Sequence, residues 1–225
     1  MCTNQGGHQS LLNKIKQLKF IKMLNMKLLS KTIILLFLIG NISIISSCNK
    51  KDIAPTDFGI FSSQDENTAI MNGVIGTNTP EHWDNYFAAN PNTHTIIMKK
   101  WPGSEDDTAN LKVARKVSTQ NIIIHLPADA EIASGAVDFY LAGISRTREA
   151  GSKIGVHSWS DGSHDATSFP VGHANHQPYI DYYKEVGFSQ ANAEAFYYFT
   201  INIAAASSIH WMTDAEIEQY KLLKP

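Results

Sequence analysis

Short apolar runs alternate with amphipathic stretches from about Ile70 to the end of the chain. Runs of four to six apolar and β-branched residues between turn signals are typical of buried strands, and four such runs predict strands at Met71–Gly76, Thr95–Lys99, Asn121–Leu126 and Lys153–His157. Apolar residues at helical spacing predict helices at Thr79–Ala89, Ser104–Val117, Ser134–Leu141, Tyr179–Val186, Ser189–Ala206 and Thr213–Tyr220. Strand–helix alternation with short connections predicts an α/β domain of parallel βαβ units.

Two of these helices carry start signals. Thr79-Pro80-Glu81 predicts a start with a hydroxyl cap and a proline in the first turn. Ser104 is the expected cap of the next helix, and the acidic residues 105–107 suit its positive end.

The first part of the chain has the layout of a secretory signal. Lys27 and Lys31 precede the apolar run TIILLFLIGNISII, which is interrupted and short for a membrane span. The run ends in Ile45-Ser46-Ser47-Cys48, which resembles a bacterial lipobox, where the cysteine receives diacylglycerol. The alternative is an uncleaved signal anchor with an incidental cysteine.

These features predict three regions. Residues 1–47 are the expected leader and lipoprotein signal peptide, with Met23 or Met26 as a candidate start. Residues 48–69 are polar, contain Pro55 and Gly59, and predict a flexible tether. Residues 70–225 form the expected globular domain. The expected location is therefore the bacterial cell envelope, with a lipid on Cys48 as the membrane anchor.

Charge and cysteine content narrow the function classes. The net charge of -2 argues against a nucleic-acid partner, because phosphate binding needs a concentrated basic face. The two cysteines are Cys2 and Cys48, so cleavage and lipidation would leave no free thiol or disulfide in the domain. Cysteine chemistry and Cys-based zinc sites are then excluded, and no cofactor is expected.

The segment IASGAVDFYLAG, residues 132–143, is the first candidate for chemistry. Ser134 lies between small residues where a loop becomes a helix. Small flanks allow a sharp turn, and the first amides of a helix are unpaired and can stabilise an oxyanion. A helix-capping serine without catalytic function is the simpler interpretation of this segment taken alone.

Two further segments give Ser134 a context. A strand leads into Trp101-Pro102-Gly103-Ser104, and a later strand in KIGVHSW ends at His157. This order resembles the Clp protease proteolytic subunit and the wider Clp/crotonase-like superfamily. That family has a Ser-Pro-Gly-Gly oxyanion turn, a serine in an Ala-Ala-Ser-Met-Gly-Ala segment, and a base on a later strand. The ending WMTDAEIEQYKL also resembles the family's last helix, and the domain looks still closer to uncharacterised bacterial periplasmic proteins of this fold.

The resemblance implies an α/β fold with a Clp/crotonase-like spiral of βαβ units, and it implies roles for several residues. Ser134 matches the nucleophile and His157 the general base. Gly135 and the turn of Gly103 and Ser104 match the oxyanion donors. Ser104 stands in place of the family's second glycine, and its backbone can take that role if its φ is negative. The fold commonly forms rings or trimers, so a homo-oligomer is an additional expectation.

The third catalytic member departs from the family pattern. The family's aspartate falls just before Trp211, where this chain has Ser207-Ser208-Ile209-His210 and no carboxylate. Ser208 and His210 are the candidate third members, and Asp138, Asp181 and Asp214 are carboxylates that the motif does not place. Without an orienting acid the histidine tautomer is less well fixed, so the site is either a Ser-His dyad or a weak or inactive one.

Other groups have simpler interpretations. Asp161, His164, His173 and His176 share one loop, but their spacing matches no standard zinc signature, so no metal site is predicted. The aromatic residues at helical spacing between 182 and 199 favour core or subunit contacts over a substrate platform.

Three functions remain. The first is an envelope serine hydrolase acting on a peptide or another acyl substrate. The second is a non-catalytic binding or scaffold lipoprotein that retains the fold. The last is an acyl-thioester enzyme of the crotonase kind, which ranks lowest because coenzyme A is rarely met outside the cytoplasm.

Overall fold

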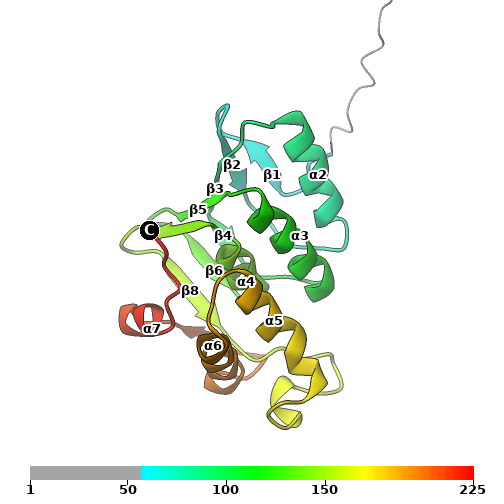
Figure 1. The fold of residues 1–225 in the computed structure, drawn as a ribbon, viewed down its shortest axis with the longest axis vertical. Helices are drawn as coiled ribbons and strands as arrows, with labels where there is room; N and C mark the ends of the chain where they lie inside the picture. The colour runs from blue at the N-terminus through cyan, green and yellow to red at the C-terminus, as the bar shows by residue number, and fades with distance from the viewer. Residues whose placement is uncertain (1–56) are drawn as a thin grey trace, which may run out of the picture. The chain divides into compact units, whose positions relative to one another are not determined.

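The structure is a computed structural model that describes residues 57–225 as one α/β unit (Figure 1). Its strands are β1 (Phe61–Ser63), β2 (Thr68–Met71), β3 (Thr95–Met98), β4 (Lys100–Trp101), β5 (Ile123–Leu126), β6 (Glu131–Ala133), β7 (Ser145–Arg148), β8 (Lys153–Val156) and β9 (His210–Trp211). Its α-helices are α2 (Thr79–Ala89), α3 (Asp107–Thr119), α4 (Gly135–Leu141), α5 (Gln177–Glu185), α6 (Gln190–Ile203) and α7 (Asp214–Gln219). Two short 3-10 turns, Ala166–Ser168 and Ala174–His176, precede α5.

The strands form two sheets that the chain builds in alternation. The five-stranded sheet has the order β1-β2-β3-β5-β7 and the four-stranded sheet the order β4-β6-β8-β9. Each successive pair, β3/β4, β5/β6 and β7/β8, adds one parallel strand to each sheet, and α3 and α4 follow the first two pairs. This repeated step winds the chain into a spiral, so the predicted α/β fold class is confirmed.

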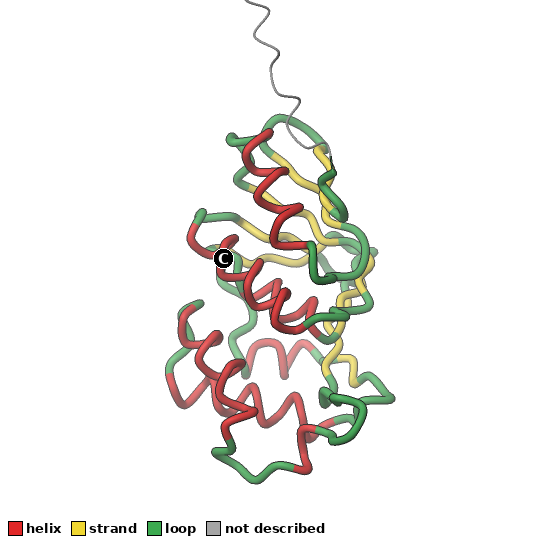
Figure 2. The backbone as a smooth tube through the Cα atoms, turned by 90° about the vertical axis from the view of Figure 1, so that its right-hand side faces the viewer, coloured by secondary structure: helices red, strands yellow, loops and turns green. Residues whose placement is uncertain are grey.

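The core lies between the strands and the helices that cover them. In Figure 2 the strands gather on one side of the fold and most helices on the other. The parallel strand β3 alternates between half-buried and fully buried residues, whereas the last three residues of β8 are all buried, as expected for a strand inside the domain. Burial of this apolar surface is the main force that holds the two sheets and the helices together.

The predicted boundary between tether and domain at residue 70 is wrong. Phe61 is only 3% exposed and packs against Trp83 with ring centroids 5.0 Å apart. The polar segment SSQDEN contains the end of β1 and the turn that leads to the antiparallel strand β2, and the side chain of Asp65 accepts a hydrogen bond from the amide of Asn67. A polar hairpin turn and a flexible tether have similar compositions, so the sequence does not distinguish them here.

We expect Phe61→Ala to lower the free energy of unfolding by roughly 3–4 kcal/mol, because it removes a buried ring and leaves a cavity against Trp83. Chemical denaturation of the two proteins measures the difference. Ser62→Ala, at the exposed neighbouring position, is the matched control and should have little effect. A loss below about 0.5 kcal/mol for Phe61→Ala, the range of ordinary surface substitutions, would show that β1 is peripheral to the folded unit.

The other predicted helices and strands are present, most with ends that differ from the prediction. The predicted strand at 71–76 lies at Thr68–Met71. The sequence does not predict β4 and β6, because two or three residues carry too little periodicity, and it does not predict β7, because its residues SRTR are polar.

The predicted helix caps are also corrected. Asp106, and not Ser104, caps α3 by accepting a hydrogen bond from the amide of Ala109 at 2.9 Å. At α2 the N-cap is Asn78 without a side-chain cap, and the Thr79 hydroxyl accepts from the amide of Gly76 instead.

The predicted leader, Cys48 and the first part of the predicted tether lie outside the described residues. Among residues 57–225, no helix has the length and apolar character needed to cross a membrane.

Candidate active site

The predicted site residues follow three adjacent parallel strands. Gly103 comes after β4, Ser134 after β6 and His157 after β8, and the register pairs Trp101 with Ile132 and Ala133 with Gly155. Carboxyl ends of parallel strands meet at one edge of a sheet, which is where α/β proteins place their ligand sites. The fold thus brings the three segments together.

Ser134 has a strained backbone. Its φ of 56° and ψ of -134° lie in a region that essentially only glycine adopts without cost. It is the N-cap residue of α4, but its hydroxyl makes no capping hydrogen bond. Its amide donates to the carbonyl of Gly155 at 3.1 Å, which fixes the turn to the neighbouring strand. The half-buried side chain is therefore free to face the pocket, and the simpler interpretation of Ser134 as a capping residue does not hold.

The turn at Gly103 and Ser104 packs directly on Ser134 and Gly135. A Cβ atom on Gly135 would lie 2.2 Å from Ser104 Oγ, and one on Gly103 would lie 2.9 Å from Ser134 Cβ. Gly103 has a φ of +131°, and Ser104 is not among the residues with positive φ, as the oxyanion role requires of it. The two segments can touch only because neither glycine has a side chain.

Two backbone amides beside Ser134 have no partner. Within residues 57–225, no hydrogen bond uses the amide of Gly135 or that of Ser104. Ile75 fixes the turn from one side, since its amide donates to the carbonyl of Gly103. The buried side chain of Asn110 donates to the carbonyl of Gly135 at 2.8 Å and fixes the other side. Asn110 is a positioning residue that the sequence did not indicate.

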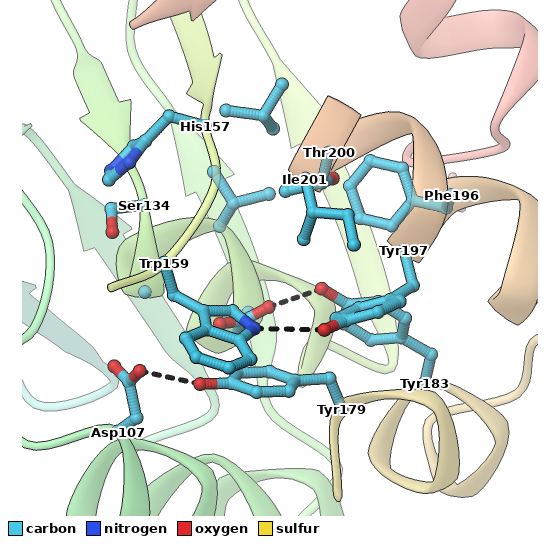
Figure 3. A pocket seen from close by; sticks show the side chains of 14 residues that line it. Asp107, Ser134, His157, Trp159, Tyr179, Tyr183, Phe196, Tyr197, Thr200 and Ile201 are labelled. Atoms are coloured by element: carbon cyan, nitrogen blue, oxygen red, sulfur yellow. Dashed lines mark hydrogen bonds between the residues drawn. The ribbon is translucent and has the colours of Figure 1, made fainter. Parts of the chain in front are cut away.

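His157 faces the same pocket as Ser134 (Figure 3). Its Nδ1 donates to the carbonyl oxygen of Ser158 at 2.7 Å in the tautomer that this contact favours. That tautomer leaves Nε2 unprotonated and able to accept a proton. No hydrogen bond joins the two side chains among the described residues, and loose geometry of this kind is common in resting sites.

The candidate third members have other partners. The exposed Ser208 hydroxyl donates to the carbonyl of Ala205, and His210 Nε2 lies 3.0 Å from Glu216 Oε2. The carboxylates are also engaged elsewhere: Asp138 with Tyr183, Asp181 with Lys184, and Asp214 with Arg148. The group that orients His157 is thus the Ser158 carbonyl, which the sequence cannot reveal because every residue has one.

An acidic and aromatic pocket adjoins Ser134 and His157. It encloses about 450 Å³, with open solvent at its mouth included. Asp107 accepts hydrogen bonds from the Tyr179 hydroxyl at 2.6 Å and from the Ser104 hydroxyl at 2.5 Å. Tyr183, Phe196 and Tyr197, whose spacing favoured core or subunit contacts, also line this pocket. The sequence gives no sign of this arrangement, because Asp107 and Tyr179 are 72 positions apart.

Asp138 forms part of the pocket wall and has an unusual acidity. Burial raises the pKa of the Asp138 carboxyl to about 7; the hydrogen bond from the Tyr183 hydroxyl opposes this rise, and the nearby charge of Asp107 adds to it. The residue lies in the first turn of α4, whose N-cap is Ser134, and both residues line the same pocket.

The histidine-rich loop has structural contacts. Buried His176 is hydrogen-bonded to the Tyr197 hydroxyl at 2.7 Å, and the His173 ring stacks on Phe169. Among residues 57–225, no group of three or more His, Cys, Asp or Glu side chains is arranged to hold a metal ion.

The fold and site together define an α/β spiral domain with a strained serine, a histidine and free amides at one sheet edge. No family model matches the chain, and no curated protein matches it. Similar solved structures include the 1510-N membrane protease specific for a stomatin homolog from Pyrococcus horikoshii, with 17% identity and a TM-score of 0.44 over 70% of this chain and 71% of that chain.

Two mutants of the membrane-bound stomatin-specific protease 1510-N are also similar. One, with a serine replaced by alanine, has 19% identity and a TM-score of 0.47 over 70% of this chain and 77% of that chain. The other, with a lysine replaced by alanine and a bound substrate peptide, has 18% identity and a TM-score of 0.44 over 72% and 75%. Likeness of this degree assigns no activity, and the fold class rests on the strand order and register. A closer likeness to uncharacterised periplasmic proteins stays a prediction.

Proposed function

We propose that this protein is a serine hydrolase of the cell envelope, peptidase-like in its chemistry, which acts on a peptide or another acyl substrate. The observation that carries the proposal is the strained backbone of Ser134 beside two unpaired amides. Strain of about 1–3 kcal/mol at one residue persists where the surrounding structure enforces it, and such residues cluster at active sites.

The reaction follows from the positions of the groups. Ser134 Oγ attacks the carbonyl carbon while its proton passes to His157 Nε2. The amides of Gly135 and Ser104 hold the oxygen that becomes negative. His157 then gives the proton to the leaving group, and water hydrolyses the acyl-enzyme with His157 as the base.

The orienting group of His157 sets the expected rate. The Ser158 carbonyl holds Nδ1–H and fixes the tautomer. A neutral carbonyl stabilises the imidazolium less than a carboxylate does, because hydrogen bonds to charged acceptors are roughly twice as strong. Turnover slower than that of a Ser-His-Asp enzyme is the expected consequence.

A fluorophosphonate probe tests the proposal directly. We expect covalent labelling of the folded protein, with the modified peptide containing Ser134. The exposed Ser163→Ala is the matched control and should label like the wild type. A folded protein that stays unlabelled would give first place to the second candidate, a non-catalytic binding or scaffold lipoprotein. That candidate is favoured because no carboxylate among the described residues is hydrogen-bonded to His157.

Envelope anchoring is a separate part of the proposal. It is supported by the basic segment, apolar run and lipobox-like residues that end at Cys48. Radiolabelled palmitate should enter the wild-type protein in bacteria and not the Cys48→Ala variant. Undiminished lipid labelling of Cys48→Ala would refute the proposed anchor without bearing on the hydrolase.

We expect Ser208→Ala and His210→Gln to change the hydrolysis rate by less than about threefold, because the Ser208 and His210 side chains are hydrogen-bonded away from His157. Initial rates on a fluorogenic peptide pool measure the effect, with folding checked by circular dichroism. A drop of a hundredfold or more in either folded variant would instead make that residue the third member, as the family position implies.

A further inference from the structure

The pocket beside Ser134 contains carboxylates without a cationic partner. Within residues 57–225, none of the ion pairs involves Asp107 or Asp138. Asp138 is 8% exposed; one of its carboxylate oxygens accepts from the Tyr183 hydroxyl at 2.7 Å, and the other has no hydrogen-bond partner among residues 57–225. A buried carboxylate is costly unless it is paired or protonated, so a ligand with a positive charge would stabilise the ionised form of Asp138.

A second polar group in the pocket also lacks a partner. The hydroxyl of Thr200, on α6, is buried and makes no hydrogen bond with any of residues 57–225. Buried polar atoms normally have partners, so this hydroxyl is a position that a polar ligand group or an ordered water can complete. This observation is independent of the carboxylates, because Thr200 comes from a different helix.

The pocket walls suit a cation with an alkyl stem. Trp159 stacks on Tyr179 with centroids 6.4 Å apart, and Tyr179 stacks on Tyr197 at 5.6 Å (Figure 3). Aromatic faces attract ammonium and guanidinium groups and cover apolar stems. Hydrogen bonds from the Trp159 indole to Tyr197 and from Tyr179 to Asp107 hold these rings in place.

The distance from the nucleophile fits a long side chain. Ser134 is the N-cap of α4 and Asp138 follows it by four residues, which corresponds to about 6 Å along the helix axis. The four-carbon stem of a lysine is comparable in length. We propose that this pocket is a specificity pocket that receives a basic side chain of the substrate, lysine or arginine, next to the bond that Ser134 attacks.

The charge of Asp138 makes this preference depend on pH. Burial raises the pKa of its carboxyl to about 7, so the group is neutral in acid and negative above that pH. The preference for a basic over a neutral side chain should therefore grow as pH rises through about 7. The titratable groups that face the pocket with it are Asp107, His157, Tyr179, Tyr183 and Tyr197.

This inference rests on the proposed function, and peptide aldehydes can test the two separately. An acetylated tripeptide aldehyde ending in lysine is compared with one ending in norleucine, which has an alkyl chain without the charge. We expect the lysine compound to bind wild-type protein at least about tenfold more tightly than the norleucine compound at pH 8. This affinity ratio of the lysine to the norleucine compound should fall toward one at pH 5.5.

In Asp138→Asn the affinities of the two aldehydes should differ by less than about threefold at every pH, because asparagine can still accept a hydrogen bond from Tyr183 but carries no charge. Asp129→Asn, at an exposed position, removes the same charge and should leave the ratio unchanged. Should Asp138→Asn fail to fold, the wild-type ratio and its pH dependence still decide the inference.

The outcomes separate the two proposals. If both aldehydes are captured by Ser134 with equal affinity, the specificity pocket is refuted and the hydrolase stands. If neither aldehyde reacts with Ser134 while Ser134→Ala protein still binds the lysine tripeptide amide in an Asp138-dependent manner, the hydrolase is refuted and the pocket stands. Equal and weak binding of both tripeptide amides to Ser134→Ala protein also overturns the pocket.

Discussion

Replacement of Ser134 by alanine or glycine is expected to reduce hydrolysis by at least about 10⁴-fold, because removal of a nucleophile leaves only binding and oxyanion stabilisation. The two variants should differ in stability. Glycine adopts the backbone angles of this residue without strain, whereas alanine keeps the strain. Allowing for the greater entropy of unfolded glycine, Ser134→Gly should be about 1 kcal/mol more stable than Ser134→Ala.

Hydrolysis of a fluorogenic peptide pool and chemical denaturation measure the two effects. Ser163→Ala, exposed and outside the site, controls for the loss of a hydroxyl. Equal stability of the alanine and glycine variants would show that the backbone at Ser134 is not strained in solution. Hydrolysis that survives both substitutions belongs to another site or to a contaminant, and the scaffold function would then take first place.

Gly135→Ala is expected to reduce the rate by about 10²–10³-fold, the loss typical of an oxyanion donor. The new methyl group would lie 2.2 Å from Ser104 Oγ and 2.8 Å from both Ser104 Cβ and Asn110 Nδ2, so the two segments must separate. The amides of Gly135 and Ser104 then move apart. The same crowding should lower the free energy of unfolding by about 1–3 kcal/mol.

A double-mutant cycle with Ser104→Gly locates the cause. Removal of the Ser104 side chain makes room for the methyl group, so the double variant should recover part of the stability that Gly135→Ala loses. Gly76→Ala is the matched control, since its Cβ meets no atom within 4 Å. Unchanged rate and stability in Gly135→Ala would mean that the turn at Gly103 and Ser104 does not pack on the serine as described.

The sequence predicts the fold class because β-branched runs and capped amphipathic stretches have clear periods. It misses β4 and β6, which matter most for the site, because strands of two or three residues have no detectable period. It also places the start of the domain too late, because the hairpin from Phe61 to Met71 contains the polar loop SSQDEN.

Residue types that carry chemistry at turns are easier to find than their partners. Ser134 and Gly135 stand out because a serine between small residues opens a predicted helix, and His157 stands out because it ends a predicted strand. The Ser158 carbonyl is a backbone group that no pattern of residue types marks, whereas the amide of Ser104 is indicated by the resemblance of the turn at Gly103 and Ser104 to the family's oxyanion turn. Asp107 and Asp138 meet the aromatic rings only through tertiary packing, since α3, α4, α5 and α6 all contribute to one pocket.

The structure of the protein after reaction with a fluorophosphonate tests the central claim most directly. We expect phosphorus bonded to Ser134 Oγ, with the phosphonyl oxygen about 2.7–3.1 Å from the amide nitrogens of both Gly135 and Ser104. His157 Nε2 should lie within hydrogen-bond reach of the modified serine oxygen. An unmodified Ser134, or an adduct whose phosphonyl oxygen points away from both amides, would contradict the proposed active site.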